Sequence, residues 1–545
     1  MDGPTPASNR PAWPWGLAAL LLLALLCLRL ASAGLTVQTA FPWSATILLD
    51  GAARIVDGQA PYRDFHTPVG FTYLGLLAVF LRLAHGLPHA LAWFSATAGL
   101  ALGALAWLVA VRRCAPPLAA AAALATGLLA ASPAFLAYGP LDLSYGGHYS
   151  RLGWSIFFVV AISCLPPARA VGAWTMLAEA AAIGACLGVL AGTKFTFLIA
   201  SAVLVGLGWW YRRPGWRPPL AMSTGFAAAC ALGLLVSGAT PAGYLRECGM
   251  VGANASLLSL LLLSRHNLDF LALGLIAVAA TLTWPALRQG WSPTPARPLP
   301  EGAASALAAL ALGLGLSATN GNEQVSPVYG LVLLILAAAP AAAGQARAAG
   351  LIAIAVFAAF ALRLATPIVI GPYAAVSPPF AALPAGPWRG LAFMPPGGEV
   401  KDTRAELWPY LSREPHGLLC NAWFDWLRDG EAILRPRVGP GERVLCLDFL
   451  NPFPYALQRP APRGDHLYWH FGRNLGERSA PRPEVLFAEV DWVMVPKVPI
   501  FKDTTRIKTE LYLGWVEAHY RKVALATESE WWTCYQRIPT TPNAP

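Results

Sequence analysis

The sequence predicts a polytopic α-helical membrane protein with a small C-terminal α/β domain outside the membrane. Of its 545 residues, 56% are hydrophobic and only 12% are charged, whereas soluble globular proteins carry roughly 25% charged residues. Many apolar runs approach the ~20 residues that a helix needs to cross a bilayer. This composition excludes a water-soluble globular enzyme, a disordered chain and a fibrous repeat.

Eleven apolar runs are predicted to cross the membrane. The first, 16–33, is expected to be an uncleaved anchor, although Ala31-Ser32-Ala33 resembles a signal-peptidase site and a cleaved signal peptide is the alternative. Segment 67–87 is apolar but contains Arg82, and we expect a re-entrant or interfacial helix there. The remaining predicted spans are 90–111, 118–137, 153–166, 172–191, 195–211, 219–237, 268–286, 303–319, 328–343 and 349–366.

The basic residues decide the orientation, because Lys and Arg are retained on the cytoplasmic side of membrane proteins. If 67–87 does not cross and the N-terminus is cytoplasmic, the basic loop residues all fall inside; if it crosses, they all fall outside. We therefore predict a cytoplasmic tail over 1–15, a transmembrane domain over 16–394 and an extracytoplasmic domain over 395–545. The loop residues in question are Arg112, Arg113, Arg169, Arg212, Arg213, Arg217, Arg288, Arg297 and Arg347.

The C-terminal segment differs from the rest in charge. From Glu399 onward there are 19 acidic and 19 basic residues, so the net charge of +10 lies in the preceding part. No basic stripe with interleaved aromatic residues suggests nucleic acid, and membrane lipids are the expected contact. Strands are predicted over 443–449, 491–495, 523–527 and 531–537, with a helix over 403–412. About 150 residues are enough for a domain to bury its own core.

The nine cysteines are scattered and form no CxxC pair, so a structural zinc site is not expected. Three of them, Cys420, Cys446 and Cys534, fall in the C-terminal domain, where one disulfide is left open.

The first external loop, 34–66, carries the most informative residues. A helix is predicted over 46–56, with Gly58 as its C-terminal cap. Asp50 and Arg54 share one face of this helix, which is expected to lie flat at the membrane surface. Asp64 follows in a non-helical stretch between two prolines. The loop therefore presents two carboxylates where lipid headgroups lie.

Sugar transfer from a lipid-phosphate donor is a reaction that such carboxylates can serve. A carboxylate can take the proton of an acceptor hydroxyl, which contributes typically ~10²–10⁴-fold. The leaving phosphate needs cations or hydrogen-bond donors, and the candidates are Arg63, Lys194, His148 and Arg265. The alternative is that Asp50 and Arg54 form only a surface ion pair, worth ~0.3–0.5 kcal/mol.

The loop resembles the first periplasmic loop of the GT-C superfamily of polyprenyl-phosphate-sugar glycosyltransferases, nearest to glycosyltransferase family 39 and the lipid A aminoarabinose transferase group. Asp50 matches the first acid of that motif, Gly58 the turn, and Tyr62-Arg63-Asp64 with Pro68 the second motif. Gly51 departs from it, because a second acid is common there. The residue-level match covers roughly 25 positions.

The resemblance implies a GT-C-like fold and an inverting glycosyltransferase at the periplasmic face of the bacterial inner membrane, part of the cell-envelope machinery. Asp50 would be the catalytic base, Asp64 would support the acceptor or a metal, and the four cations would hold the donor phosphate. The donor would be a polyprenyl-phosphate-linked sugar, and the acceptor a lipid, polysaccharide or protein. No cofactor is assigned, and a divalent metal is left open.

Further residues are candidates for substrate binding: Tyr62, Asp142, Tyr149 and Glu323. Asp142, His148 and Tyr149 lie in a Gly-rich external loop, 138–151, that is equally well an ordinary connector. Lys194 interrupts two apolar runs and either meets a phosphate or reaches the headgroups with its long side chain.

Two other classes of protein remain open. Many spans with a few charged residues also suit a transporter or lipid flippase, although these usually place their charges near the middle of the membrane. A non-catalytic assembly partner with an altered loop is the second alternative.

Overall fold

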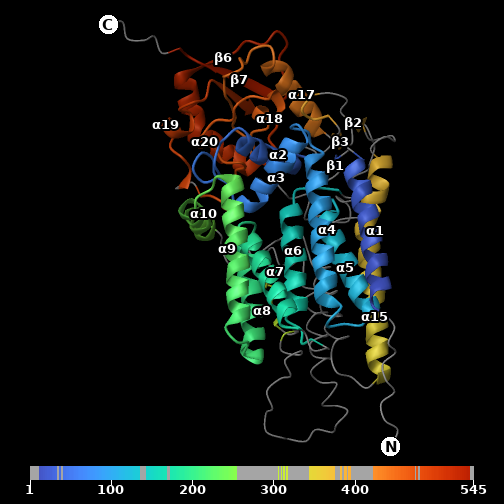
Figure 1. Cartoon of the computed structure of the whole chain (residues 1–545). Coiled ribbons are helices and arrows are strands. Elements are labelled where there is room, and N and C mark those ends of the chain that lie inside the picture. Colours follow the sequence, from blue (N-terminus) through green and yellow to red (C-terminus); the bar gives the residue numbers. More distant parts are fainter. Residues whose placement is uncertain are drawn as a thin grey trace, which may run out of the picture.

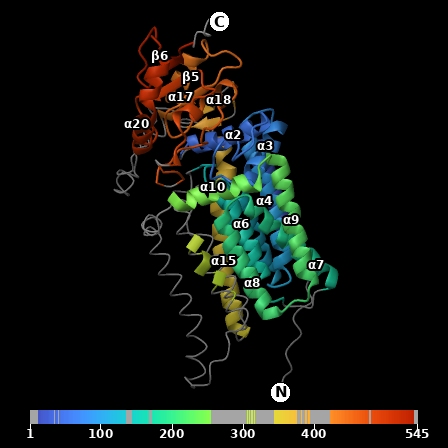
Figure 2. The same cartoon turned by 90° about the vertical axis from the view of Figure 1, so that its left-hand side faces the viewer.

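The computed structural model shows a long helical bundle with a mixed α/β domain at one end (Figure 1). The same arrangement is seen after a quarter turn (Figure 2). The residues that the structure describes are 11–33, 36–38, 41–134, 143–167, 172–254, 305, 308–309, 311–313, 315–316, 343–374, 381–382, 386–389, 391–393, 422–472, 474–476 and 479–539.

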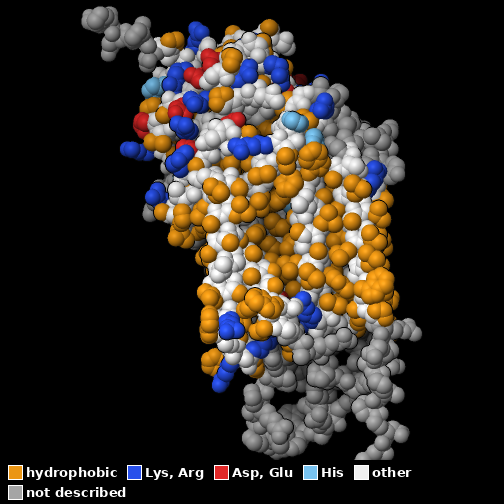
Figure 3. Space-filling model, in the orientation of Figure 1, with side chains coloured by type: hydrophobic (Ala, Val, Ile, Leu, Met, Phe, Trp, Pro, Cys, Tyr) orange, Lys and Arg blue, Asp and Glu red, His pale blue; other side chains and the backbone are white. Residues whose placement is uncertain are grey.

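Six helices of this described part are long and apolar enough to cross a membrane. Five of them are α1 (Trp13–Ser32), α4 (Ala90–Ala110), α7 (Ala173–Ala191), α8 (Phe195–Arg212) and α9 (Arg217–Ser237), and the sixth is the Ala353–Gly371 part of α15 (Ala343–Ala374). Helices α5 (Pro116–Ala131) and α6 (His148–Ser163) are shorter. Hydrophobic side chains cover the face of this bundle that Figure 3 shows, as expected of helices that face lipid.

Eight of the predicted spans coincide with these helices. Predicted spans 268–286 and 328–343 lie outside the described residues, and 303–319 is described only at scattered positions. The chain is therefore helical with several apolar, membrane-compatible helices, and the total of eleven spans stays a prediction.

Basic residues gather at the end of the bundle that lies opposite the α/β domain. Glu179 of α7 pairs with Arg112 at 2.9 Å and with Arg113 at 2.5 Å, at the end of α4. Arg113 and Arg212 both donate to the carbonyl of Ser163 at the end of α6. Lys and Arg side chains are visible at this lower end in Figure 3. The structure thus brings to one end residues that the orientation rule assigns to one side.

Segment 67–87 forms a short helix, α3 (Phe71–Leu83), that lies below the α/β domain in Figure 1. At its start, Thr72 N donates to the carbonyl of Gly192, which follows α7, at 2.7 Å. Beyond its end, the Tyr455 hydroxyl of the α/β domain donates to the carbonyl of Gly86 at 2.8 Å. Its 13 residues rise only about 20 Å, less than the ~30 Å of a bilayer core.

Helix α2 (Trp43–Val56) begins three residues before the predicted 46–56 helix and ends as expected. Gly58 has φ +86°, a left-handed conformation that glycine adopts without strain. The expectation that α2 lies flat at the membrane surface stays a prediction. The α/β domain covers it, and Asp50 and Arg54 are 3% and 1% exposed.

The α/β domain contains a four-stranded sheet in the order β4-β5-β7-β6. Strand β4 (Val444–Cys446) runs parallel to β5 (Trp492–Pro496), and β7 (Trp532–Arg537) is antiparallel to both β5 and β6 (Tyr520–Lys522). Its helices are α17 (Trp423–Leu434), α18 (Phe453–Leu457), α19 (Pro483–Leu486) and α20 (Lys502–His519). The predicted helix 403–412 lies outside the described residues.

One strand prediction, 523–527, is wrong, because the strand lies at 520–522. Tyr520 begins it directly after α20, with its side chain 3% exposed and its hydroxyl donating to the carbonyl of Val490 at 2.8 Å. Burial of this ring fixes the register of the strand, and the chain turns after Val523. Within the turn that leads to β7, the carbonyl of Ser529 accepts from Lys497 Nζ at 2.7 Å.

The first loop and the α/β domain are joined by backbone pairing. His66 N donates to the carbonyl of Asp465 at 2.9 Å, and Leu467 N donates to the carbonyl of His66 at 2.8 Å. His66 Nδ1 lies within hydrogen-bond distance, 3.0 Å, of Glu247 Oε2 in α10 (Pro241–Asn254). A small sheet also pairs β1 (Thr36–Gln38) with β3 (Leu391–Phe393), which in turn pairs with β2 (Ala381–Ala382). The described start of the first loop is therefore held by the chain that follows α15.

Candidate functional site

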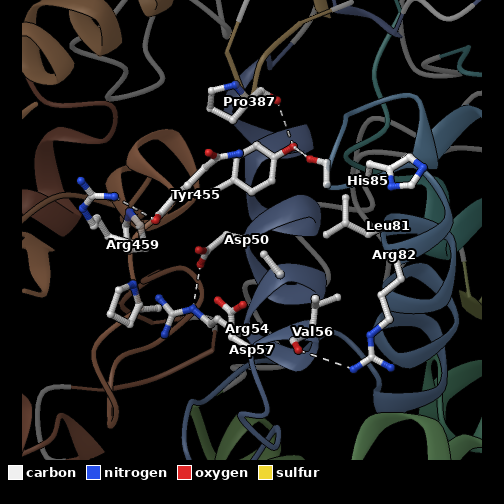
Figure 4. Close-up of a pocket in the computed structure, with 16 residues that line it drawn as sticks. Asp50, Arg54, Val56, Asp57, Leu81, Arg82, His85, Pro387, Tyr455 and Arg459 are labelled. Carbon is white, nitrogen blue, oxygen red and sulfur yellow. Dashed lines mark hydrogen bonds and ion pairs between the residues drawn. The ribbon is translucent and has the colours of Figure 1, made fainter. Parts of the chain in front are cut away.

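A cavity of about 560 Å³ lies where α2, the end of α3 and the α/β domain meet (Figure 4). This volume lies in the range of small-molecule sites, roughly 300–1,000 Å³. Its lining comes from four separate parts of the chain: 50–57, 81–86, Pro387 and 454–461. The polar members are Asp50, Arg54, Asp57, Arg82, His85, Gln458 and Arg459, and the others include Val56, Leu81, Pro387, Pro454 and Tyr455.

Asp50 is the buried carboxylate of this lining. Its Oδ2 accepts from Arg54 Nε at 2.8 Å, one turn along α2. No hydrogen bond to Oδ1 is found within the part of the chain that the structure describes. Burial raises the pKa of Asp50 above its ordinary value, and the charge and hydrogen bond of Arg54 oppose that rise. The carboxylate therefore keeps one oxygen for a ligand in a setting that favours taking up a proton.

Arg54 is fixed by three acceptors. Besides Asp50, it donates from Nη1 to the carbonyl of Pro462 at 3.1 Å and from Nη2 to Asp465 Oδ2 at 3.3 Å. The ring of Phe65 lies 5.5 Å from its guanidinium carbon. The alternative of a solvent-exposed ion pair at Asp50 does not describe this geometry, because both side chains are buried and the pair continues into the α/β domain.

Three further basic residues, Arg82, His85 and Arg459, line the same cavity and can serve an anionic ligand. Arg82 donates to the carbonyl of Val56 at 3.5 Å, at the edge of hydrogen-bond range, and is otherwise exposed. His85 is exposed. Arg459 Nη1 reaches two carbonyls at 3.4 Å, while its buried Nε has no hydrogen-bond partner among the described residues. A buried N–H without a partner is costly, and a phosphate oxygen would satisfy it.

Tyr455 closes the cavity on the side of the α/β domain. Its hydroxyl lies 2.8 Å from the carbonyl of Gly86 and 3.2 Å from that of Pro387. Its ring packs edge-on against Trp388 with centroids 4.8 Å apart. Because these bonds join the end of α3 to α18, they hold Arg82, His85 and Arg459 around one space.

The second motif of the loop does not line this cavity. Asp64 Oδ2 accepts from Ala60 N at 2.8 Å and from Arg63 Nη2 at 2.7 Å. Burial alone would raise the pKa of Asp64, but the hydrogen bonds from Arg63 and Ala60 outweigh burial and lower it. Tyr62 donates to the carbonyl of Val69 at 3.0 Å and is buried. These residues shape the loop.

The predicted phosphate-binding residues His148 and Lys194 lie in other places. His148 is completely buried between Tyr73 Oη at 2.8 Å and the carbonyl of Ala130 at 2.7 Å. Because a carbonyl only accepts, His148 donates from Nε2. Lys194 donates to Ser150 Oγ at 2.7 Å, with its Nζ 4.8 Å from the centre of the Tyr149 ring. Neither His148, Lys194 nor Tyr149 lines the cavity.

Among the predicted site residues that the structure describes, Asp50 alone lines this cavity. The predicted Asp142, Arg265 and Glu323 lie outside the described residues. In the described ranges, no group of three or more His, Cys, Asp or Glu side chains is arranged to hold a metal ion. Cys446 and Cys534 are free and buried.

Sequence reasoning missed the cations of the cavity. Arg82 gave a signal, since it interrupts an apolar segment, and Tyr455 lies in an aromatic stretch. Arg459 and Asp465 gave none, because they meet α2 from about 400 residues further along the chain.

No protein-family model matches the chain, and no curated protein matches it. Among solved structures, the chain is similar to the crystal structure of ArnT from Cupriavidus metallidurans bound to undecaprenyl phosphate. The two are 12% identical, the similarity covers 96% of this chain and 98% of that chain, and the TM-score is 0.34.

Proposed function

We propose that this protein is a membrane glycosyltransferase that moves a sugar from a polyprenyl-phosphate donor to an acceptor hydroxyl, with inversion. The observation that carries the proposal is that Asp50, Arg82, His85 and Arg459 line the same cavity. A carboxylate beside several cations suits a reaction in which one oxygen loses a proton while a phosphate leaves.

The reaction proceeds by direct displacement at the anomeric carbon of the sugar. The acceptor oxygen forms a bond to this carbon as its proton passes to the open oxygen of Asp50. The bond between the carbon and the phosphate oxygen breaks, and the polyprenyl phosphate leaves with one additional negative charge. Arg459 and Arg82 stabilise that charge, and His85 can donate a hydrogen bond to it. Attack opposite the leaving group inverts the anomeric configuration.

The size of the cavity suits the sugar and phosphate of such a donor. A volume of about 560 Å³ accommodates a sugar and a phosphate but not a long polyprenyl chain, which would stay in the bilayer. In the proposed orientation, the α/β domain and the cavity face the periplasm of a bacterial inner membrane. This agrees with a donor whose sugar is presented on the outer leaflet.

A deletion strain provides the test. Mass spectrometry of its lipid-linked sugars and surface glycans should show a lost glycan increment and an accumulated polyprenyl-phosphate sugar. Wild type should restore the glycan, and Asp50→Asn at equal abundance should reduce transfer by about 10²–10⁴-fold. Asp503→Asn, an exposed carboxylate of α20, is the matched control and should behave as wild type. Full restoration by Asp50→Asn would contradict the proposal.

A further inference from the structure

A row of buried charges runs from the cavity into the α/β domain. Arg54 bridges Asp50 at 2.8 Å and Asp465 at 3.3 Å. The other oxygen of Asp465, Oδ1, accepts from Trp469 Nε1 at 3.0 Å. The Nζ of Lys508 lies 4.2 Å from the centre of the Trp469 ring. Cations and carboxylates therefore alternate along this row.

The row ends at Asp448, whose carbonyl accepts from Lys508 Nζ at 3.0 Å. Asp50, Asp465 and Asp448 are three carboxylates against two cations, Arg54 and Lys508, and all five side chains are at most 3% exposed. With every member ionised, the row carries one net negative charge. Unbalanced buried charge is expensive, so the row is stabilised when it takes up one proton.

Access to the cavity distinguishes the three carboxylates. Asp448 accepts backbone N–H bonds on both oxygens, from Phe449 at 2.6 Å and Ile500 at 2.9 Å; burial raises its pKa, but Asp448 does not line the cavity. Asp465 also accepts on both oxygens, from Arg54 and Trp469, and does not line the cavity either. Asp50 uses only Oδ2 in its bond to Arg54 and is the carboxylate of the row that lines the cavity.

We propose that Asp465 is a positioning residue that shares Arg54 with Asp50 and thereby leaves Asp50 as the member of the row that accepts a proton from the cavity. This inference rests on the proposed transferase function, in which that proton comes from the acceptor hydroxyl. In the absence of Asp465, Arg54 would neutralise Asp50 alone and weaken it as a base. Burial is the main cause that raises the pKa of Asp50, and the negative charge of Asp465 adds to the rise.

The pH dependence of kcat/KM for the acceptor, measured on the full-length protein in liposomes, tests this role. Asp465→Asn keeps the shape of the side chain and removes its charge. In this variant, the acidic limb of the pH profile of kcat/KM should move down by about one pH unit. The plateau value of kcat/KM should fall several-fold, because a weaker base accepts the proton less well.

Two further variants separate charge from packing. Trp469→Phe removes the indole donor but keeps the charge of Asp465, so its acidic limb should stay within a few tenths of a pH unit of wild type. Asp503→Asn makes the same charge change at the domain surface and should not move the limb. An unmoved limb in Asp465→Asn, or an equal shift in Trp469→Phe, overturns the inference.

If Asp465→Asn does not accumulate, wild type still keeps the inference falsifiable. The acidic limb of wild type should lie above about pH 4, the ordinary pKa of an aspartate, and a limb at or below that pH overturns the inference. The inference and the proposed function fail differently. Transfer retained by Asp50→Asn removes the function itself, whereas transfer abolished in Asp50→Asn with an unmoved limb in Asp465→Asn removes only the role of Asp465.

Discussion

Gly51 of helix α2 lies directly beneath Leu467 of the α/β domain: a Cβ atom at Gly51 would be 2.8 Å from Leu467 Cδ2 and 3.0 Å from Leu74 Cδ2. The transferases that the first loop resembles commonly carry a second acid at this place. Here the domain occupies that space with apolar side chains. The glycine therefore reflects the close approach of α2 to the α/β domain, one residue beyond Asp50.

A small side chain at Gly51 should be tolerated, whereas a charged one should destabilise the contact between α2 and the α/β domain. Gly51→Ala meets the far end of a flexible leucine, which can move, so we expect a change in Tm of at most a few degrees. Gly51→Glu places a carboxylate between Leu467 and Leu74, where burial without a partner costs several kcal/mol. We expect rapid protease cleavage between the bundle and the α/β domain in that variant. Equal protease resistance of the two variants would contradict the contact.

Arg459 should matter for the donor more than for the acceptor. Arg459→Gln removes the buried Nε donor and the charge that we assign to the leaving phosphate. Loss of a hydrogen bond to a charged group costs about 1.5–3 kcal/mol, so kcat/KM for the lipid-phosphate donor should fall by about 10- to 100-fold. Steady-state kinetics with each substrate varied in turn would measure this. Arg428→Gln, an exposed residue of α17 outside the cavity lining, is the control, and an equal effect there would exclude a specific role.

The contact between the first loop and the α/β domain should weaken in acid. His466 is 3% exposed, with ring centroids 4.9 Å from His66 and 4.8 Å from Trp469. Burial, together with the nearby His66 and Lys508, lowers the pKa of His466 well below its ordinary value. The unfolded chain therefore binds a proton that the folded protein excludes. This stabilising contribution is fully present above about pH 6.5, the ordinary value for histidine, and is lost as the pH falls towards the folded pKa.

Thermal unfolding at pH 7.5 and 5.5 would measure that loss. Wild type should lose about 1.4 kcal/mol at pH 5.5 from this group, while His466→Asn should show a smaller difference between the two pH values. His519→Asn, an exposed histidine at the end of α20, should follow wild type. A pH dependence of His466→Asn that equals that of wild type would assign the acid sensitivity to other groups.

The two ends of the bundle should react differently with an impermeant thiol reagent in intact cells. Arg463, exposed on the α/β domain, and Arg217, exposed at the start of α9, are suitable positions. Arg463→Cys should be labelled from outside, whereas Arg217→Cys should be labelled only after the cells are permeabilised. Wild type, with its native cysteines, gives the background. The reverse pattern would invert the proposed orientation.

The helical part of the fold could be predicted because a bilayer-spanning helix is specified locally. An apolar run of suitable length needs no distant partner to be identified, and eight predicted spans coincide with helices. Segment 67–87 was also recognisable as different, because Arg82 interrupts it. The strand near residue 520 was misplaced, since its register depends on the buried ring of Tyr520 packing in a sheet whose other strands lie elsewhere in the chain.

The candidate site divides in the same way. From the sequence alone Asp50 was a candidate, because an acid after the first apolar run, a glycine turn and the following Tyr-Arg-Asp motif resemble the first loop of the GT-C transferases. Only the tertiary structure decided that Asp50 is buried with Arg54, that Asp465 shares that arginine, and that Arg82, His85 and Arg459 surround the same cavity. The physical reason is that the environment of a charge depends on which groups are close in space, and the groups that set it here come from segments about 400 residues apart.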